Sequence, residues 1–136
     1  MGLTVLIVDD SEAVRFFHKI VVTQSKLSAE PLMFGTSQEA LTYLDQHSDE
    51  KNTYLILLDI NMPVMNGWDL MNAIDHKNYK SRFHIVMVTS SVATADHEKS
   101  KLYGMVIDFV EKPISPEECE KIMHMSPIAP YFEPSF

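Results

Sequence analysis

The sequence contains few of the residues on which several protein classes depend. Its 136 residues include one cysteine, one tryptophan and four glycines. A lone cysteine, Cys119, cannot form an internal disulfide, and this is typical of proteins in a reducing compartment. No apolar run approaches the roughly 20 residues that span a bilayer. The opening run at 3–8 is too short for a signal peptide and has no basic stretch before it. We therefore expect a cytoplasmic protein with no membrane partner.

Positive charge is also scarce. The chain has 11 Lys and Arg residues against 19 Asp and Glu, which gives a formal net charge of −8. Nucleic-acid binding requires a basic face, so we expect no nucleic-acid partner. Surplus carboxylates often form only a solvated surface, but they also permit a cation site. Hydrophobic residues make up 46% of the chain, which fits one ordinary globular domain.

Apolar runs alternate with segments of helical periodicity along the chain. The first run, at 3–8, is continuous and β-branched at several positions, as in a strand buried on both faces of a parallel sheet. Helix start signals follow the runs: Ser11 before Val14, Phe17, Ile20 and Val21 at helical spacing, Thr36 or Ser37 before a second helix, and Ser115-Pro116 before the last. We expect helices also at 68–76 and at 93–103, the latter closed by Gly104. Strands are expected at 3–8, 31–34, 54–58, 85–88 and 106–110.

This alternation predicts an α/β fold with a doubly wound, five-stranded parallel sheet and helices on both faces. We assign 1–125 to the domain and 126–136 to a C-terminal extension. The extension has three prolines and three aromatic residues. We expect it to pack irregularly on the domain surface, with a docking peptide for a partner as the alternative.

Polar residues stand where the predicted strands end. Asp9 and Asp10 follow the first strand, Asp59 the third, Thr89 ends the fourth and Lys112 follows the fifth. Ligands of such folds bind at the carboxyl ends of the strands, so these groups can converge in one pocket. Clustered carboxylates repel one another, and a hard cation such as Mg²⁺ relieves the repulsion. Asp9, Asp10, Asp59 and the backbone carbonyl of Asn61 are the plausible ligands.

Such a pocket suits phosphoryl chemistry. A carboxylate can attack phosphorus to form an aspartyl phosphate. The charge on the transferred group is then stabilised by the metal, by the Lys112 ammonium and by the Thr89 hydroxyl.

These motifs resemble the receiver domain of bacterial response regulators, including the chemotaxis type. The resemblance covers roughly residues 3–125 in the family's order and spacing. The matching segments are VDDS (8–11), LLDINMPVMNG (57–67), VTSS (88–91) and FVEKP (109–113).

The resemblance implies a flavodoxin-like strand order of 2-1-3-4-5 and a role for each matching residue. Asp59 would be the phosphoacceptor, Asp9 and Asp10 the Mg²⁺ ligands, Lys112 the phosphoryl-binding cation, and Thr89 and Phe109 the switch pair. The phosphate would come from a phosphohistidine on a histidine kinase or a phosphotransfer protein. With no effector domain in the sequence, we expect output through binding to an unknown downstream protein.

Some positions depart from the commoner family pattern. The switch aromatic is Phe109, which lacks the hydroxyl of the usual tyrosine. Asn61 and Ser91 hold the positions that tune dephosphorylation, and neither supplies a strong base, so we expect slow self-hydrolysis. The last helix is short, which argues against the usual dimer face and favours a monomer or weak dimer.

Other functions remain open from the residues alone. A degenerate receiver would act as an unphosphorylated interaction module, and a relay intermediate would pass the phosphate onward. A hydrolase of the haloacid dehalogenase type also forms an aspartyl phosphate, but its first strand carries Asp-x-Asp rather than Asp-Asp.

Overall fold

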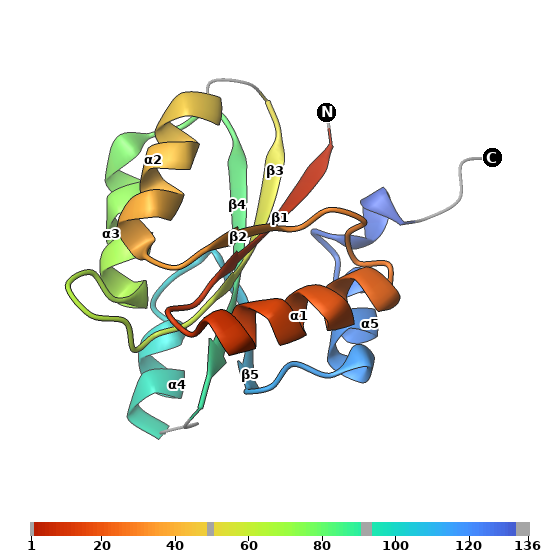
Figure 1. The fold of residues 1–136 in the computed structure, drawn as a ribbon. Coiled ribbons are helices and arrows are strands. Elements are labelled where there is room, and N and C mark those ends of the chain that lie inside the picture. Colours follow the sequence, from red (N-terminus) through yellow and green to blue (C-terminus); the bar gives the residue numbers. More distant parts are fainter. Residues whose placement is uncertain (1, 49–50, 91–93, 133–136) are drawn as a thin grey trace.

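The computed structural model describes residues 2–48, 51–90 and 94–132, and its centre is a five-stranded parallel sheet (Figure 1). The strand order is β2-β1-β3-β4-β5, which confirms the doubly wound topology. The strands are β1 (Leu3–Val8), β2 (Leu32–Phe34), β3 (Thr53–Leu58), β4 (Arg82–Thr89) and β5 (Val106–Glu111).

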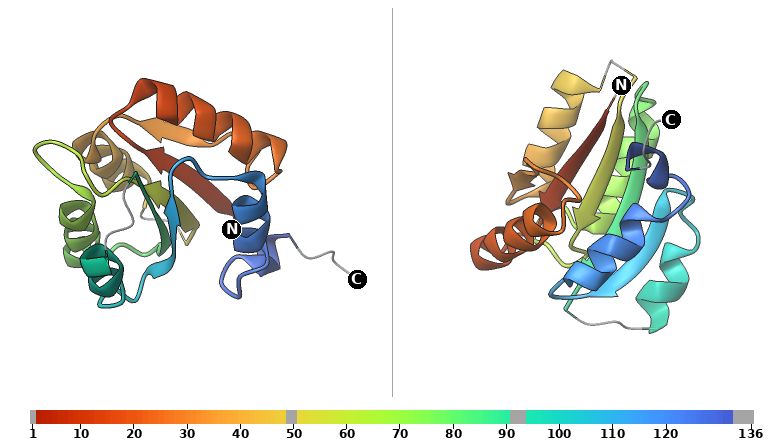
Figure 2. Two further views of the ribbon diagram at one scale, coloured as in Figure 1. Left: turned by 90° about the horizontal axis from the view of Figure 1, so that it is seen from below. Right: turned by 90° about the vertical axis from the view of Figure 1, so that its right-hand side faces the viewer.

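Helices cover both faces of the sheet, giving three layers (Figure 2). The helices are α1 (Glu12–Gln24), α2 (Ser37–His47), α3 (Gly67–Lys77), α4 (Thr94–Ser100) and α5 (Pro116–Met123). Alternate residues of β1 point to opposite faces. Leu6 and Val8 therefore join one core cluster with α2 and α3, whereas Val5 and Ile7 join a second with α1 and α5. Among the described residues, no helix is long and apolar enough to cross a membrane.

Side-chain caps fix where the helices begin, largely as the sequence predicts. Ser11 and Thr36 each accept a backbone N–H of the first turn of α1 and α2. Reciprocal capping boxes open α3, through Asn66 and Asp69, and α5, through Ser115 and Glu118. Helices α1 and α3 thus start directly after the loops that follow β1 and β3.

The structure corrects the prediction for α4. The helix ends at Ser100, not at Tyr103, and Gly104 is not its C′ residue, since no described glycine has a positive φ. Residue 93 lies outside the described residues. The sequence of α4 is polar, so little apolar burial holds its last turn, and the chain leaves it through i→i+3 hydrogen bonds from Lys101 and Leu102.

Apolar residues of α1 occur on more than one side of the helix. His18, Val21 and Val22 face the core, whereas Phe17 and Ile20, together with Phe16, are exposed. The sheet can cover only one stripe of a helix. Phe16, Phe17 and Ile20 therefore form an apolar side of α1 that the sheet does not cover.

The C-terminal extension packs on the domain as far as Phe132. Ile128 is fully buried among α5, β1 and β3 residues, and a 3₁₀ helix, η1 (Ala129–Tyr131), follows it. The Tyr131 hydroxyl lies 2.5 Å from the Thr53 hydroxyl at the start of β3. Residues 133–136 lie outside the described residues. The extension thus returns to the edge of the sheet where the strands begin.

Candidate functional site

The register of the parallel strands gathers the predicted site residues at one edge of the sheet. The Asp59 N–H donates to the Val8 carbonyl at 2.9 Å, which places Asp59 level with Asp9. The Lys112 N–H donates to the Thr89 carbonyl at 2.6 Å, which ties the ends of β4 and β5 together. These backbone bonds bring the four side chains to the carboxyl end of the sheet.

An ion triad forms the centre of this edge. The Lys112 Nζ lies 2.6 Å from Asp9 Oδ2 and 3.3 Å from Asp59 Oδ2. Asp9 and Asp59 are both buried, and the Lys112 side chain keeps 15% of its surface exposed. Charge-assisted bonds of this kind are strong, although one lysine can neutralise only one of the two buried carboxylates. The triad is therefore a strictly positioned unit.

Backbone amides orient the second oxygen of each carboxylate. Asp9 Oδ1 accepts the Ser11 N–H at 2.9 Å, at the start of α1. Asp59 Oδ1 accepts the Asn61 N–H at 3.3 Å, in the loop after β3. These hydrogen bonds and the Lys112 contacts therefore fix the orientation of both carboxylates.

The carboxylates fit a hard cation. Asp10 is exposed, and ligand atoms of Asp9, Asp10 and Asp59 all lie within 4.8 Å of one another. A set of oxygen donors with one side open to water suits Mg²⁺, which usually retains several of its waters. The Asn61 carbonyl remains an expectation as a fourth ligand. Ser91 lies outside the described residues.

Burial and charge shift the pKa of Asp59 and of Lys112 upward. The pKa of Asp59 is raised by burial first and by the charge of Asp9 next, and the nearby Lys112 opposes both. Burial alone would lower the pKa of Lys112, but hydrogen bonds and charges from Asp9 and Asp59 outweigh it and raise that pKa. Perturbed groups gathered in one place are typical of functional sites.

Gly67 allows the loop after β3 to lie against Asp59. A Cβ on Gly67 would stand 2.7 Å from the Asp59 carbonyl oxygen and 3.1 Å from Ile60 Cα. The Gly67 N–H also donates to the Ile60 carbonyl at 2.9 Å. Only a residue without a side chain permits this approach, so Gly67 helps to set the position of the Asp59 backbone.

Two residues that the sequence did not single out support the site. The Arg15 side chain donates to the Asp9 carbonyl at 2.7 Å. The buried His18 accepts the Ile114 N–H on Nε2 at 3.2 Å, just beyond the cis Lys112–Pro113 bond. Burial lowers the pKa of His18, which favours the neutral ring that this bond requires. The sequence places Arg15 and His18 on the helix after the first strand, but this position alone does not predict their contacts.

The two predicted switch residues lie on neighbouring strands. Thr89 ends β4 and is fully buried, whereas Phe109, on β5, is half-buried. The Phe109 ring stacks on the His97 ring of α4, with centroids 5.1 Å apart and an interplanar angle of 21°. A movement of the Phe109 ring would therefore change a contact with α4.

Comparison with known proteins identifies the family. The family model for the response regulator receiver domain matches residues 5–124. The chain belongs to this family. The match includes every predicted site residue and ends before the C-terminal extension.

Individual relatives agree with this receiver assignment. The chain is 31% identical over 116 residues to the chemotaxis protein CheY1 of Helicobacter pylori, covering 85% of this chain and 89% of that protein. It is 33% identical over 85 residues to the transcriptional regulatory protein HptR of Staphylococcus aureus, covering 62% of this chain but 30% of that protein. The crystal structure of a CheY-like receiver domain protein from Methanospirillum hungatei matches with a TM-score of 0.65 and 28% identity, covering 88% and 90% of the two chains.

Proposed function

We propose that this receiver is a phosphorylation switch in which Asp59 accepts a phosphoryl group in a Mg²⁺-dependent reaction. The contact of Lys112 with both Asp9 and Asp59 is the observation that carries the proposal. It places a cation beside the carboxylate that would bear the phosphate, and Asp10 completes an oxygen-donor set next to it.

The residues of the site account for the transfer. An Asp59 oxygen attacks phosphorus, the P–N bond of a phosphohistidine breaks, and its electron pair returns to the imidazole nitrogen. The Lys112 ammonium binds one phosphoryl oxygen and the Thr89 hydroxyl donates to another. Asp9, Asp10 and the Asn61 carbonyl would hold Mg²⁺, which supplies positive charge to the phosphoryl oxygens when bound.

The signal would leave the site through Thr89 and Phe109. A phosphoryl group adds about −1.5 to −2 charge and strong acceptor oxygens. Movement of Thr89 toward these oxygens makes room beside it, and the Phe109 ring turns inward into that space. This movement ends the stacking with His97 and alters the surface of α4. Output then follows from a downstream protein that distinguishes the two surfaces.

The exposed apolar side of α1 is our proposed contact for the phosphohistidine protein. Phe16, Phe17 and Ile20 lie within a few turns of Asp10, and all three are exposed. Exposed apolar patches next to a polar site commonly mark protein interfaces. The buried Cys119 thiol suits a reducing compartment, and we place the protein in the cytoplasm.

Phosphorylation by acetyl phosphate with Mg²⁺, followed by intact mass, tests the proposal. We expect a mass gain of one phosphoryl group, lost in Asp59→Asn and after removal of Mg²⁺. Asp75→Asn, an exposed carboxylate of α3, is the matched control and should be labelled like the wild type.

Failure of this experiment has a defined meaning. No adduct with acetyl phosphate or with any phosphohistidine donor would support an unphosphorylated interaction module instead. An adduct that passes quantitatively to a histidine phosphotransfer protein would support a relay intermediate. Steady release of phosphate from a phosphoester would indicate a hydrolase.

A further inference from the structure

A polar cavity lies at the opposite edge of the sheet from Asp59. It has a volume of about 270 Å³ and is lined by Lys51, Asn52, Thr53, Lys80, Arg82 and Tyr131. Thr53 and Arg82 are the first residues of β3 and β4, whereas Asp59 follows the last residue of β3. A strand of six residues separates the two edges by about 20 Å. Ligands of the two sites would therefore not overlap.

The cavity gathers positive charge in an acidic protein. Three of its six lining residues are cations, although the chain carries a net charge of −8. Within the described ranges, every ion pair involves other lysines, and no carboxylate lines this cavity. Asp49 and Glu50 precede Lys51 in the sequence and lie outside those ranges. Among the described residues, Lys51, Lys80 and Arg82 have no carboxylate in an ion pair with them, and this favours an anion as ligand.

The uncharged lining residues provide a fixed amide side chain and one hydroxyl hydrogen that can bind a ligand. The Asn52 side chain accepts the Gly2 N–H on Oδ1 and donates from Nδ2 to the Thr4 hydroxyl oxygen, so its position is fixed. Thr53 and Tyr131 share one hydrogen bond between their hydroxyls, in which either oxygen is the donor. The pair has two hydroxyl hydrogens and uses one, which leaves one to donate to a ligand.

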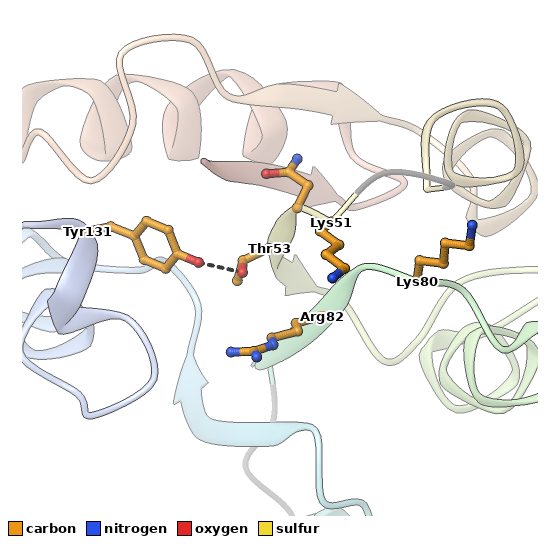
Figure 3. A pocket seen from close by; sticks show the side chains of 6 residues that line it. Lys51, Thr53, Lys80, Arg82 and Tyr131 are labelled. Atoms are coloured by element: carbon orange, nitrogen blue, oxygen red, sulfur yellow. Dashed lines mark hydrogen bonds between the residues drawn. The ribbon is translucent and has the colours of Figure 1, made fainter. Parts of the chain in front are cut away.

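The side chains reach the cavity from three separate segments. Figure 3 shows Lys51 and Thr53 from the start of β3, Lys80 and Arg82 from the segment that leads into β4, and Tyr131 from η1. Lys80 stands at the end of the group farthest from Tyr131 in this view. Tyr131 lies beyond the residues that match the receiver family, which end at 124. The cavity is thus completed by the extension of this chain rather than by the family fold.

We propose that this cavity binds a small anion bearing two linked phosphate groups, either free pyrophosphate or the diphosphate of a nucleotide. The Arg82 guanidinium suits bidentate contact with phosphate oxygens, and the lysines act as point charges. The three cations do not converge on one point, because Lys80 lies apart from Lys51 and Arg82 in Figure 3, and this spacing favours a diphosphate over a single phosphate. The volume of about 270 Å³ suits a diphosphate group but not a whole larger organic ligand, whose sites typically start at about 300 Å³, so a nucleotide would place only its diphosphate in the cavity.

Titration of the metal-free protein with pyrophosphate and, separately, with ADP tests the proposal. Backbone amide NMR locates the binding, and isothermal calorimetry measures the affinity at physiological ionic strength. We expect saturable binding with shifts at 51–53, 80–82 and around Tyr131. The combined variant Lys51→Gln, Arg82→Gln should bind at least about tenfold more weakly, and Tyr131→Phe several-fold more weakly. Lys19→Gln, which removes an exposed charge of α1, should bind like the wild type.

The results distinguish a nucleotide from free pyrophosphate, and they also show whether the proposal fails. If ADP binds more tightly than pyrophosphate, the ligand is a nucleotide. If ADP binds equally or more weakly, the ligand is free pyrophosphate. The proposal is overturned if shifts gather only around Asp59 and Lys112, if binding never saturates, or if the double variant binds as well as the wild type. Circular dichroism of the double variant checks that it is folded, and neither residue is buried.

Discussion

The charge of Asp59 is linked to the stability of the fold, because the pKa of this carboxyl is raised by burial and by Asp9. A raised folded-state pKa means that stability from this group is present below the unfolded pKa of about 3.9 and is lost as pH rises through the folded value. The Asn side chain of Asp59→Asn does not ionise, so this variant does not lose stability as the pH rises. We expect the variant to melt a few degrees above the wild type at pH 7, with the gap closing as pH falls. Thermal unfolding across this range, with Asp75→Asn as control, would refute the argument if Asp59→Asn melted lower at neutral pH.

Gly67 offers a second test at the scale of one residue. A methyl group there would meet the Asp59 backbone at 2.7 Å, and neither backbone segment moves freely. We expect Gly67→Ala to destabilise the fold by about 1–3 kcal/mol and to slow labelling by acetyl phosphate. Gly104→Ala is the control, since a Cβ there meets nothing within 4 Å and φ is not positive. Equal stabilities of the two variants in urea would contradict the role assigned to Gly67.

Residues of the site differ in how far the sequence predicts them. Asp9, Asp59 and Lys112 follow runs that are typical of buried strands, and parallel strands bring their carboxyl ends together. The contacts of Arg15 and His18 were not predictable in the same way. These contacts depend on the distance of α1 from the ends of β1 and β5, and this distance cannot be predicted from sequence periodicity.

At the scale of elements, α4 is the part that phosphorylation is expected to change. The His97 ring of α4 stacks on the Phe109 ring of β5. If Phe109 turns inward, the His97 ring loses the shielding of the stacked aromatic. We expect the His97 ring-proton NMR signals to shift on phosphorylation in wild type and to stay unchanged in Asp59→Asn. His76, exposed on α3, is the internal control, and an unmoved His97 signal in fully phosphorylated protein would count against the Phe109 switch.

The C-terminal extension is an element of the core as well as a cover for the sheet edge. Ile128 is fully buried although it lies beyond the family match. We expect Ile128→Ala to destabilise the protein by about 2–5 kcal/mol in chemical unfolding. Leu102→Ala should change stability by less than about 0.5 kcal/mol, because Leu102 is 82% exposed. A small effect at Ile128 would show that the extension is only loosely attached.

Most elements match the sequence prediction, including the short β2, whereas the start of β4 and the end of α4 do not. The α5 start was predictable because Ser115, Pro116 and Glu118 form a recognised capping pattern. The end of α4 was not, because its polar sequence gives no stripe that marks where packing stops. The path of 126–132 back to Thr53 also required the structure, since it depends on contacts with distant strands.

The whole molecule separates charge between the two edges of one sheet. Carboxylates of Asp9, Asp10 and Asp59 gather at the carboxyl end, whereas Lys51, Lys80 and Arg82 gather at the amino end. Each edge would thereby favour ligands of opposite sign, and at physiological salt the distance between the edges exceeds the Debye length of about 8 Å. We therefore expect a cation at one edge and an anion at the other to bind almost independently.

Binding of Mg²⁺ should stabilise the whole fold by mass action, because the unfolded chain does not assemble the three carboxylates. At a Mg²⁺ concentration of 100 times Kd, the gain is about 2.7 kcal/mol. Asp10→Asn should abolish the melting-temperature rise while leaving the metal-free stability close to that of the wild type, since Asp10 is exposed. Lowering the pH should weaken the rise in wild type, because protons compete for the carboxylates and the pKa of Asp59 is already raised. Differential scanning calorimetry with and without Mg²⁺ measures both effects, and an equal rise in Asp10→Asn would place the cation elsewhere.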